Sequence, residues 1–255
     1  MRDTPGKADL HIHTSYSDGM MEASEVLDHV ESQTDLDVIA ITEHDDVRGS
    51  LAARELWAKG NFRFDFVTGV EVTAIEGHIL ALYVEEPVPS LVRTEEILEA
   101  VHKQGGLCVV AHPMSLFVRS LDRLTMERVA ASKKEGVYFD GIETANQSPA
   151  MLGRNRMAAR LNRVRLRLAE TGSSDAHFLK AIGAAYTAFP GRSAAELRQS
   201  ILDCTTIPVR VRGLSVAEIG VKAIVRQSWR GISATPRVMG WGPTAMSFVR
   251  RIFRR

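Results

Sequence analysis

Two hydrophobic periods alternate along the chain and predict strands and helices in turn. Short apolar or period-two runs predict strands at residues 8–12, 37–46, 64–73, 77–84, 107–111, 141–146, 165–169, 185–189 and 207–211. Amphipathic runs between them predict helices at residues 22–33, 48–59, 94–104, 121–135, 150–162 and 194–203. Such alternation favours an α/β fold with a parallel sheet.

Side chains that bind metals recur where these strands end. Six of the eight histidines lie in or beside strand-end loops: His11, His13, His44, His78, His112 and His177. The loops that follow the strands of a (β/α) barrel converge on one rim, whereas an open doubly wound sheet brings few strand ends together. The pattern therefore favours a barrel with its chemistry at the C-terminal rim.

The first strand shows the ligand pattern most clearly. Because side chains alternate along a strand, His11 and His13 leave the same face and can reach one ion. Carboxylates take matching positions at Asp18, Glu71 and Asp175. Taken singly, Glu71 could instead cap the following turn, His78 could be a satisfied strand histidine, and Asp175 could be a helix N-cap. Nine candidate ligands exceed the roughly four to six that one ion binds, so the set predicts two or three ions.

Composition indicates a folded globular protein with an uneven charge distribution. The chain has 255 residues, of which 45% are hydrophobic and 25% charged, and its net charge is +1. Residues 213–255 hold eight basic residues and one acid, a net charge of +7, which leaves −6 for residues 1–212. We therefore divide the chain into a domain at 1–212 and a basic, partly helical extension at 213–255.

The last eleven residues place arginines and apolar side chains at helical spacing. A basic amphipathic helix at residues 245–255 could contact nucleic-acid phosphates or, weakly, an anionic membrane surface. It could equally pack its apolar face on the barrel. Cys108 and Cys204 suggest no disulfide framework, and the chain shows neither a signal-peptide core nor an apolar run of about 18 residues. We expect a cytoplasmic enzyme.

Five motifs together resemble the PHP family (polymerase and histidinol phosphatase). They occur in the family's order within residues 8–212: Asp9-Leu-His-Ile-His-Thr with Ser17-Asp-Gly, Ile41-Thr-Glu-His-Asp, Gly69-Val-Glu, Ala111-His-Pro and Ser174-Asp-Ala-His. The resemblance implies a distorted (β/α)7 barrel and a trinuclear centre of Mn, Zn or Fe. Glu43 stands where the family usually has Asp, and we expect it to support a ligand rather than bind an ion.

The resemblance also implies how the ligands divide among the ions. His11, His13, Glu71 and Asp175 would hold one ion, and Glu71 would bridge to a second ion completed by His78 and His112. A third ion would take Asp18, His44 and His177. Only residues 79–111 separate the fourth motif from the preceding ligand, His78, which leaves little room for a lid and predicts an open site.

The function that follows is metal-dependent hydrolysis of a phosphomonoester, a small phosphorylated metabolite or nucleotide, by attack of a metal-bridging hydroxide. Catalytic roles fall to Glu71, to Asp45 as a residue that orients a histidine or passes a proton, and to Arg154 as a phosphate clamp, with Arg48 and Arg119 as further candidates. The alternatives are an exonuclease acting on RNA or DNA ends, an amide or C–N hydrolase, and a metal-binding PHP module without turnover. The sequence does not indicate an oligomeric state.

Overall fold

The computed structural model describes residues 4–115, 118–151, 153–211, 216–220, 222–223, 225–227 and 229–230. In this part of the chain, nine strands form one sheet in the order β7-β6-β5-β4-β3-β2-β1-β8-β9. The strands are β1 (Gly6–Ile12), β2 (Val38–Ile41), β3 (Asp65–Thr73), β4 (His78–Leu82), β5 (Leu107–Val110), β6 (Gly141–Asn146), β7 (Ala169–Ser173), β8 (Ala185–Phe189) and β9 (Ile207–Arg210).

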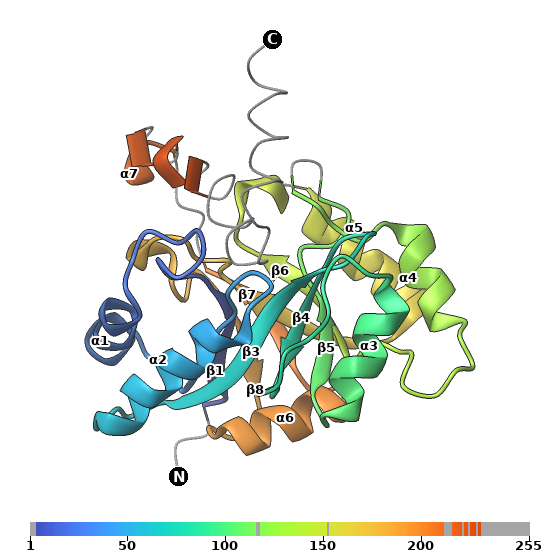
Figure 1. Cartoon of the computed structure of the whole chain (residues 1–255), viewed down its shortest axis with the longest axis horizontal. Helices are drawn as coiled ribbons and strands as arrows, with labels where there is room; N and C mark the ends of the chain where they lie inside the picture. Colours follow the sequence, from blue (N-terminus) through green and yellow to red (C-terminus); the bar gives the residue numbers. More distant parts are fainter. Residues whose placement is uncertain are drawn as a thin grey trace.

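The sheet curls into a nearly closed barrel (Figure 1). Its closure lies just beyond β7, where Ala176 forms a parallel bridge with Ile12 of β1. The backbone N–H of His13 donates to the Ala176 carbonyl at 2.9 Å, and the Ala176 N–H donates to the His11 carbonyl at 3.2 Å. These bonds bring the end of the first strand beside the loop after β7. The predicted distorted barrel is confirmed.

Strand direction departs from the predicted parallel alternation at β4. Strands β1 to β3 are parallel, as are β5 to β7, but β4 is antiparallel to both of its neighbours. Residues 74–77 connect β3 to β4 without a helix. Strand β8 is antiparallel to β1, and β9 is antiparallel to β8. Because β4 runs backwards, its first residue, His78, lies at the rim where the parallel strands end.

Helices cover the outside of the barrel (Figure 1). They are α1 (Ala23–Gln33), α2 (Val47–Lys59), α3 (Thr94–Lys103), α4 (Arg123–Ala130), α5 (Arg154–Leu161) and α6 (Ala194–Leu202), and a short α7 (Val216–Ile219) follows. Helix α1 buries Val26, Leu27 and Val30, the apolar positions of its 3.6-residue period. All four residues of β2 are buried, as expected of a strand covered on both faces.

One predicted strand, residues 165–169, is wrong. A π-helix at Asn162–Leu166 continues α5, and β7 begins only at Ala169. The Asn162 carboxamide bonds both the N–H and the carbonyl of Leu168, which holds the turn between helix and strand. Gly172 and Ser173, which lie outside the predicted strands, belong to β7.

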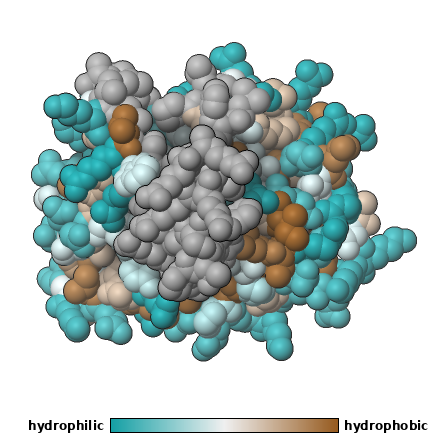
Figure 2. All heavy atoms as spheres, turned by 45° about the horizontal axis from the view of Figure 1, so that its top comes forward, coloured by the Kyte–Doolittle hydropathy of each residue, from teal (hydrophilic) through white to brown (hydrophobic). Residues whose placement is uncertain are grey.

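The rim face carries the C-terminal residues that the structure describes. The described part of this face is mostly hydrophilic, with hydrophobic patches between (Figure 2). None of the described helices is long and apolar enough to cross a membrane. The predicted amphipathic helix at residues 245–255 lies outside the described residues, so its role and the division at residue 212 stay predictions.

Candidate metal centre

All nine predicted ligands lie together at the rim. Their side chains form four overlapping groups, within each of which the candidate ligand atoms are no more than 4.8 Å apart: His13, Asp18, His44 and His177; His11, His112 and Asp175; His11, His13 and Glu71; His44, Glu71 and His78. The fold collects them because the ends of the parallel strands and the start of β4 meet at this rim.

Glu71 occupies the middle of the cluster and is 1% exposed. Its Oε2 lies 3.3 Å from His11 Nε2 and 3.2 Å from His13 Nε2. Its Oε1 lies 2.9 Å from His78 Nδ1 and 2.8 Å from His112 Nε2. Its Oε2 also lies 3.2 Å from His44 Nδ1, so the two oxygens face different sets of histidines, which is the arrangement of a carboxylate that can bridge two ions.

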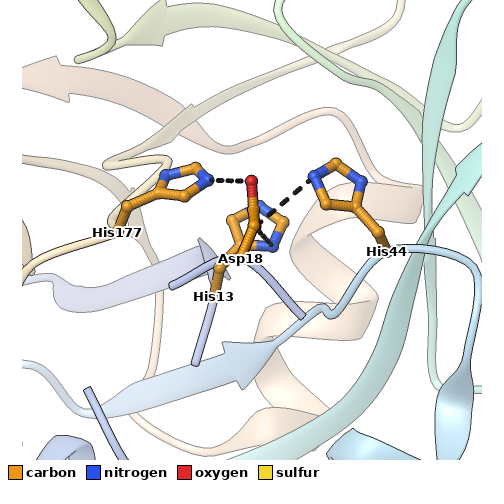
Figure 3. A group of neighbouring side chains, drawn as sticks. All are labelled: His13, Asp18, His44 and His177. Atoms are coloured by element: carbon orange, nitrogen blue, oxygen red, sulfur yellow. Dashed lines mark hydrogen bonds and ion pairs between the residues drawn. The ribbon is translucent and has the colours of Figure 1, made fainter. Parts of the chain in front are cut away.

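Asp18 organises the other side of the cluster. Figure 3 shows its carboxylate between His177 and His44, with the ring of His13 behind it. Its Oδ2 lies 3.2 Å from His177 Nε2, and its Oδ1 lies 3.7 Å from His44 Nε2 and 3.8 Å from His13 Nδ1. These four side chains come from three loops, those that follow β1, β2 and β7.

Two candidate ligands have a backbone that non-glycine residues seldom adopt. The φ angle is +53° at Asp175 and +28° at His112. Asp175 Oδ1 lies 3.6 Å from His11 Nε2 and from His13 Nε2. Strain of this kind clusters at functional sites, because the surrounding structure must hold it.

The chemistry of the donor set fits divalent cations. His11 Nε2, both nitrogens of His13, His44 Nδ1 and His112 Nδ1 are buried without a hydrogen-bond partner among the described residues. Several of these nitrogens face a carboxylate oxygen at 3.2–3.6 Å. Two ligands on one ion, each about 2.1 Å from it, lie roughly 3.0–3.4 Å apart. Buried imidazole lone pairs at this spacing are what a cation site requires.

The electrostatics of the cluster also call for positive charge. Burial opposes the charged form of Glu71, but His44, His11 and His78 hold the pKa of its carboxyl well below the usual range. Burial and the neighbouring His177 lower the pKa of His13 to about 4, so this imidazole stays neutral. A buried anion among imidazoles that cannot all be protonated favours bound cations.

Glu143 supports the cluster and was not predicted as a functional residue. It is fully buried in β6, and its Oε1 lies 3.0 Å from His11 Nδ1. Its Oε2 accepts from the backbone N–H of His112 at 2.6 Å and from Asn146 Nδ2 at 2.8 Å. A carboxylate on Nδ1 fixes the tautomer that leaves Nε2 free to bind a metal. The feature of the sequence that could have identified Glu143 is an acidic residue inside a short, otherwise uncharged strand.

Glu43 ties the end of β2 to the loop that carries Asp18. Its carboxylate accepts from the backbone N–H of Thr14 at 3.1 Å and from the Thr14 and Ser17 hydroxyls. Burial raises its pKa to about 7. In the same loop Gly19 has no room for a side chain, because an added Cβ would lie 2.4 Å from the His13 carbonyl oxygen. Glu43 lies where it can support the ligands, as predicted.

The carboxylate of Asp45 bonds Thr73 at the end of strand β3 and does not orient a histidine. Its Oδ1 accepts from the Thr73 N–H at 2.7 Å and its Oδ2 from the Thr73 hydroxyl at 2.8 Å. Burial raises the pKa of its carboxyl, although Thr73 partly offsets the effect. Thr73 lines the cavity over the cluster, so Asp45 fixes one cavity wall. The suggested role in proton transfer remains a prediction.

A cavity of about 390 Å³ opens over the cluster. Its described lining combines seven of the candidate ligands with other residues: Thr73, Val118, Gln147, Ser148, Ser174, Phe178, Ala181, Ile219 and Gln227. None of the three predicted arginine clamps is among them. Arg48 bonds Asp46, Arg119 donates to the Ile75 carbonyl, and Arg154 points to Met157 Sδ at 3.5 Å. A phosphate-binding role for Arg154 stays a prediction that this geometry does not support.

A fifth cluster of possible ligands lies away from the rim, and the ring nitrogens of its histidine already have hydrogen-bond partners within the protein. His102, Cys108 and Asp140 come together there. His102 Nδ1 lies 2.8 Å from the Gly136 carbonyl, and its Nε2 lies 2.9 Å from Asp140 Oδ2. Both ring nitrogens of this histidine lie against protein oxygens, so it is a structural partner of Asp140. His29, in α1, is absent from the groups of described ligand residues.

Known proteins resemble the chain in sequence and fold. A family model described as PHP-associated matches residues 153–206. An uncharacterized protein of Methanocaldococcus jannaschii is 35% identical over 152 residues, which cover 55% of this chain and 81% of that relative. A two-domain Bacteroides vulgatus protein containing a predicted PHP-like metal-dependent phosphoesterase superposes with a TM-score of 0.62 and 22% identity, over 81% of this chain and 65% of that one.

The chain belongs to the PHP family. Divalent metals suit such a protein, and the groups of ligand residues at the rim could hold them. The phosphoribosyl 1,2-cyclic phosphate 1,2-diphosphodiesterase of Eggerthella lenta is 38% identical over 89 residues. That match spans 32% of this PHP-family chain and 33% of the relative, so it covers only a third of the other enzyme.

Proposed function

We propose that this protein is a metal-dependent phosphoesterase that hydrolyses a phosphomonoester, either a small phosphorylated metabolite or a nucleotide. The observation that carries the proposal is the position of Glu71, whose two oxygens face separate sets of histidines beneath the cavity. A carboxylate bridge between neighbouring cations is the basis of phosphoryl-transfer sites with two metals. The volume of about 390 Å³ is near the lower end of the roughly 300–1,000 Å³ common for ligand pockets, which suits a small substrate.

We assign the nine side chains as ligands of three divalent ions. Glu71 would bridge the ion of His11, His13 and Asp175 to the ion of His78 and His112. Asp18, His44 and His177 would hold the third, and the structure adds His13 to their neighbourhood. Imidazole and carboxylate ligands suit Mn, Zn and Fe alike.

The residues of the chain position the reactants. When bound, the cations supply Lewis-acid activation of the phosphoryl group and of the attacking water. His44, His78 and His177 are the partly exposed histidines of the cluster, with side chains 13%, 12% and 18% exposed, so substrate meets the cluster on their side. Gln147 and Ser148 line the same cavity and offer hydrogen bonds that can orient the substrate.

A substrate panel tests the reaction class. The protein, loaded with Mn²⁺, is assayed on phosphomonoesters, phosphodiesters and amides, and each activity is compared with that of His112→Ala. We expect phosphate release from monoesters that falls at least about a hundredfold in the variant, because a ligand of the centre is lost. Equal release by both proteins would assign the activity to a contaminant, and cleavage of amides alone would point to a C–N hydrolase.

Phosphodiester cleavage is the second candidate. It is favoured by the E. lenta relative, which is a phosphodiesterase, and, for nucleic-acid ends, by the net charge of +7 in residues 213–255. Truncation at Gly240 removes four arginines, Arg250, Arg251, Arg254 and Arg255. If the extension binds RNA or anionic vesicles, the truncated protein will bind them more weakly. Unchanged binding to both would exclude these roles for the removed residues.

A further inference from the structure

The described C-terminal residues lie at the rim, against the loop that carries Asp18. Helix α7 stands above the ends of the barrel strands (Figure 1). Gln227 Nε2 donates to Asp18 Oδ2 at 3.3 Å, and Arg230 Nη2 donates to the Ser15 carbonyl at 2.7 Å. Both acceptors belong to the loop between β1 and α1. The C-terminal residues are therefore attached to the candidate metal centre itself.

Two of these residues complete a wall of the cavity. Ile219 and Gln227 line it together with Phe178 of the loop after β7. Ile219 and Phe178 also line a second hollow of about 280 Å³. They therefore form the partition between the two spaces. The short segment at residues 79–111 leaves little room for a lid and predicts an open site. The cavity is less open than that, because Ile219 and Gln227 from the C-terminal part of the chain form one of its walls.

The lining beyond the ligands has a definite chemical character. Val118, Phe178, Ala181 and Ile219 present carbon surface, while Gln147 and Gln227 present carboxamides that can donate and accept hydrogen bonds. Among the residues that the structure describes, no lysine or arginine lines this cavity. A flat, uncharged group with an apolar face and a hydrogen-bonding edge suits such a lining, whereas a second phosphate would meet no cationic side chain there.

We propose that Ile219 and Gln227 are specificity-determining residues that select phosphoesters of an uncharged, ring-bearing alcohol of the aromatic or nucleoside type. The inference rests on the proposed phosphoesterase function. Ile219 packs against the ring, and Gln227 closes the cavity beside Asp18 and bonds the edge of the group. The metal centre binds the phosphoryl end of the same substrate.

A pair of non-hydrolysable phosphonates tests this assignment by binding rather than by turnover. Calorimetric titrations compare benzylphosphonate with methylphosphonate on the full chain loaded with Mn²⁺, with the metal content measured for each protein. We expect the wild type to prefer the benzyl compound about tenfold or more, since burial of a ring contributes substantially. Ile219→Ala and Gln227→Ala should each reduce that preference about fivefold.

The same segment supplies matched controls. Val225 and Trp229 are 63% and 70% exposed and do not line the cavity, so Val225→Ala and Trp229→Ala should keep the preference of the wild type. An unchanged preference for benzylphosphonate in the Ile219 and Gln227 variants, or an equal loss of it in the two controls, would overturn the role of these two residues and leave the proposed function standing. Failure of the metal-loaded wild type to bind either phosphonate would overturn the proposed function as well.

Discussion

At the scale of single residues, the centre depends on carboxylates that orient imidazoles. Glu143 is the clearest case, because one buried side chain contacts the His11 ring and the strained backbone of His112. Its Oε1 accepts the Nδ1 proton of His11 and so leaves Nε2 directed at Glu71 and Asp175. Such partners of metal-binding histidines tune both the tautomer and the basicity of the ligand.

We expect Glu143→Gln to lower the affinity for Mn²⁺ about 10- to 100-fold, because an amide no longer selects the correct tautomer. Metal titration followed by mass spectrometry measures the change. The matched control is Asp140→Asn, which alters the other buried histidine–carboxylate pair and should affect melting temperature without affecting metal content. Equal metal affinity in wild type and Glu143→Gln would contradict the role assigned to this residue.

The candidate ligands could be predicted from sequence, while their support could not. His11, Glu71 and Asp175 stand in short motifs at strand ends, where local spacing already implies convergence. Glu143 reaches His11 across 132 residues of sequence, and Gln227 reaches Asp18 across 209, so only the folded chain reveals these contacts. The directions of the three arginine side chains could not be predicted for the same reason, because a position after a strand-end motif does not say where a long side chain points.

At the scale of secondary structure, the elements were predicted well and their directions less well. The range of β6 was predicted to the residue, and α1 to within one, because hydrophobic period and capping agree there. The antiparallel direction of β4 depends on the short connection after β3, which hydrophobic period does not encode. The π-helix after α5 depends on the Asn162 side chain, a contact that a pattern of polar and apolar positions does not show.

The end of helix α3 carries a pH-dependent contact. Burial opposes the charged form of His102, but Asp140 and the Gly136 carbonyl outweigh it and raise the pKa of the imidazole above its ordinary value. A raised pKa in the folded state means that the pair stabilises the fold fully below about pH 6.5 and loses this contribution as the pH rises through the raised value. His102→Gln should therefore lower the melting temperature more at pH 6 than at pH 10.

His29 in helix α1 provides a control of opposite sign. Burial lowers the pKa of its imidazole, so its protonation at low pH disfavours the folded state. His29→Gln should accordingly show no larger loss of melting temperature at pH 6 than at pH 10. A His102→Gln effect that is independent of pH would show that the ion pair with Asp140 contributes nothing in its charged form.

At the scale of the whole molecule, the barrel places three buried carboxylates, Asp18, Glu71 and Asp175, close together at one rim. Cations that bind only the folded protein stabilise it, by about 2.7 kcal/mol at a hundredfold excess over the dissociation constant. For a chain of this size that gain corresponds to a melting temperature higher by roughly 5–10 °C. We expect chelation to lower the melting temperature by this amount and Mn²⁺ to restore it. A transition that chelation leaves unmoved would argue against resident metals.

We infer that Glu71 joins bound cations into a hydrolytic centre. The most direct test measures metal per chain by mass spectrometry, together with phosphate release from p-nitrophenyl phosphate, for wild type and Glu71→Gln supplied with Mn²⁺. This role of Glu71 predicts about two to three ions and phosphate release for the wild type, and at least one ion fewer with release at least about a hundredfold slower for the variant. Fewer than two ions and no release from the metal-loaded wild type would contradict it and leave a binding module.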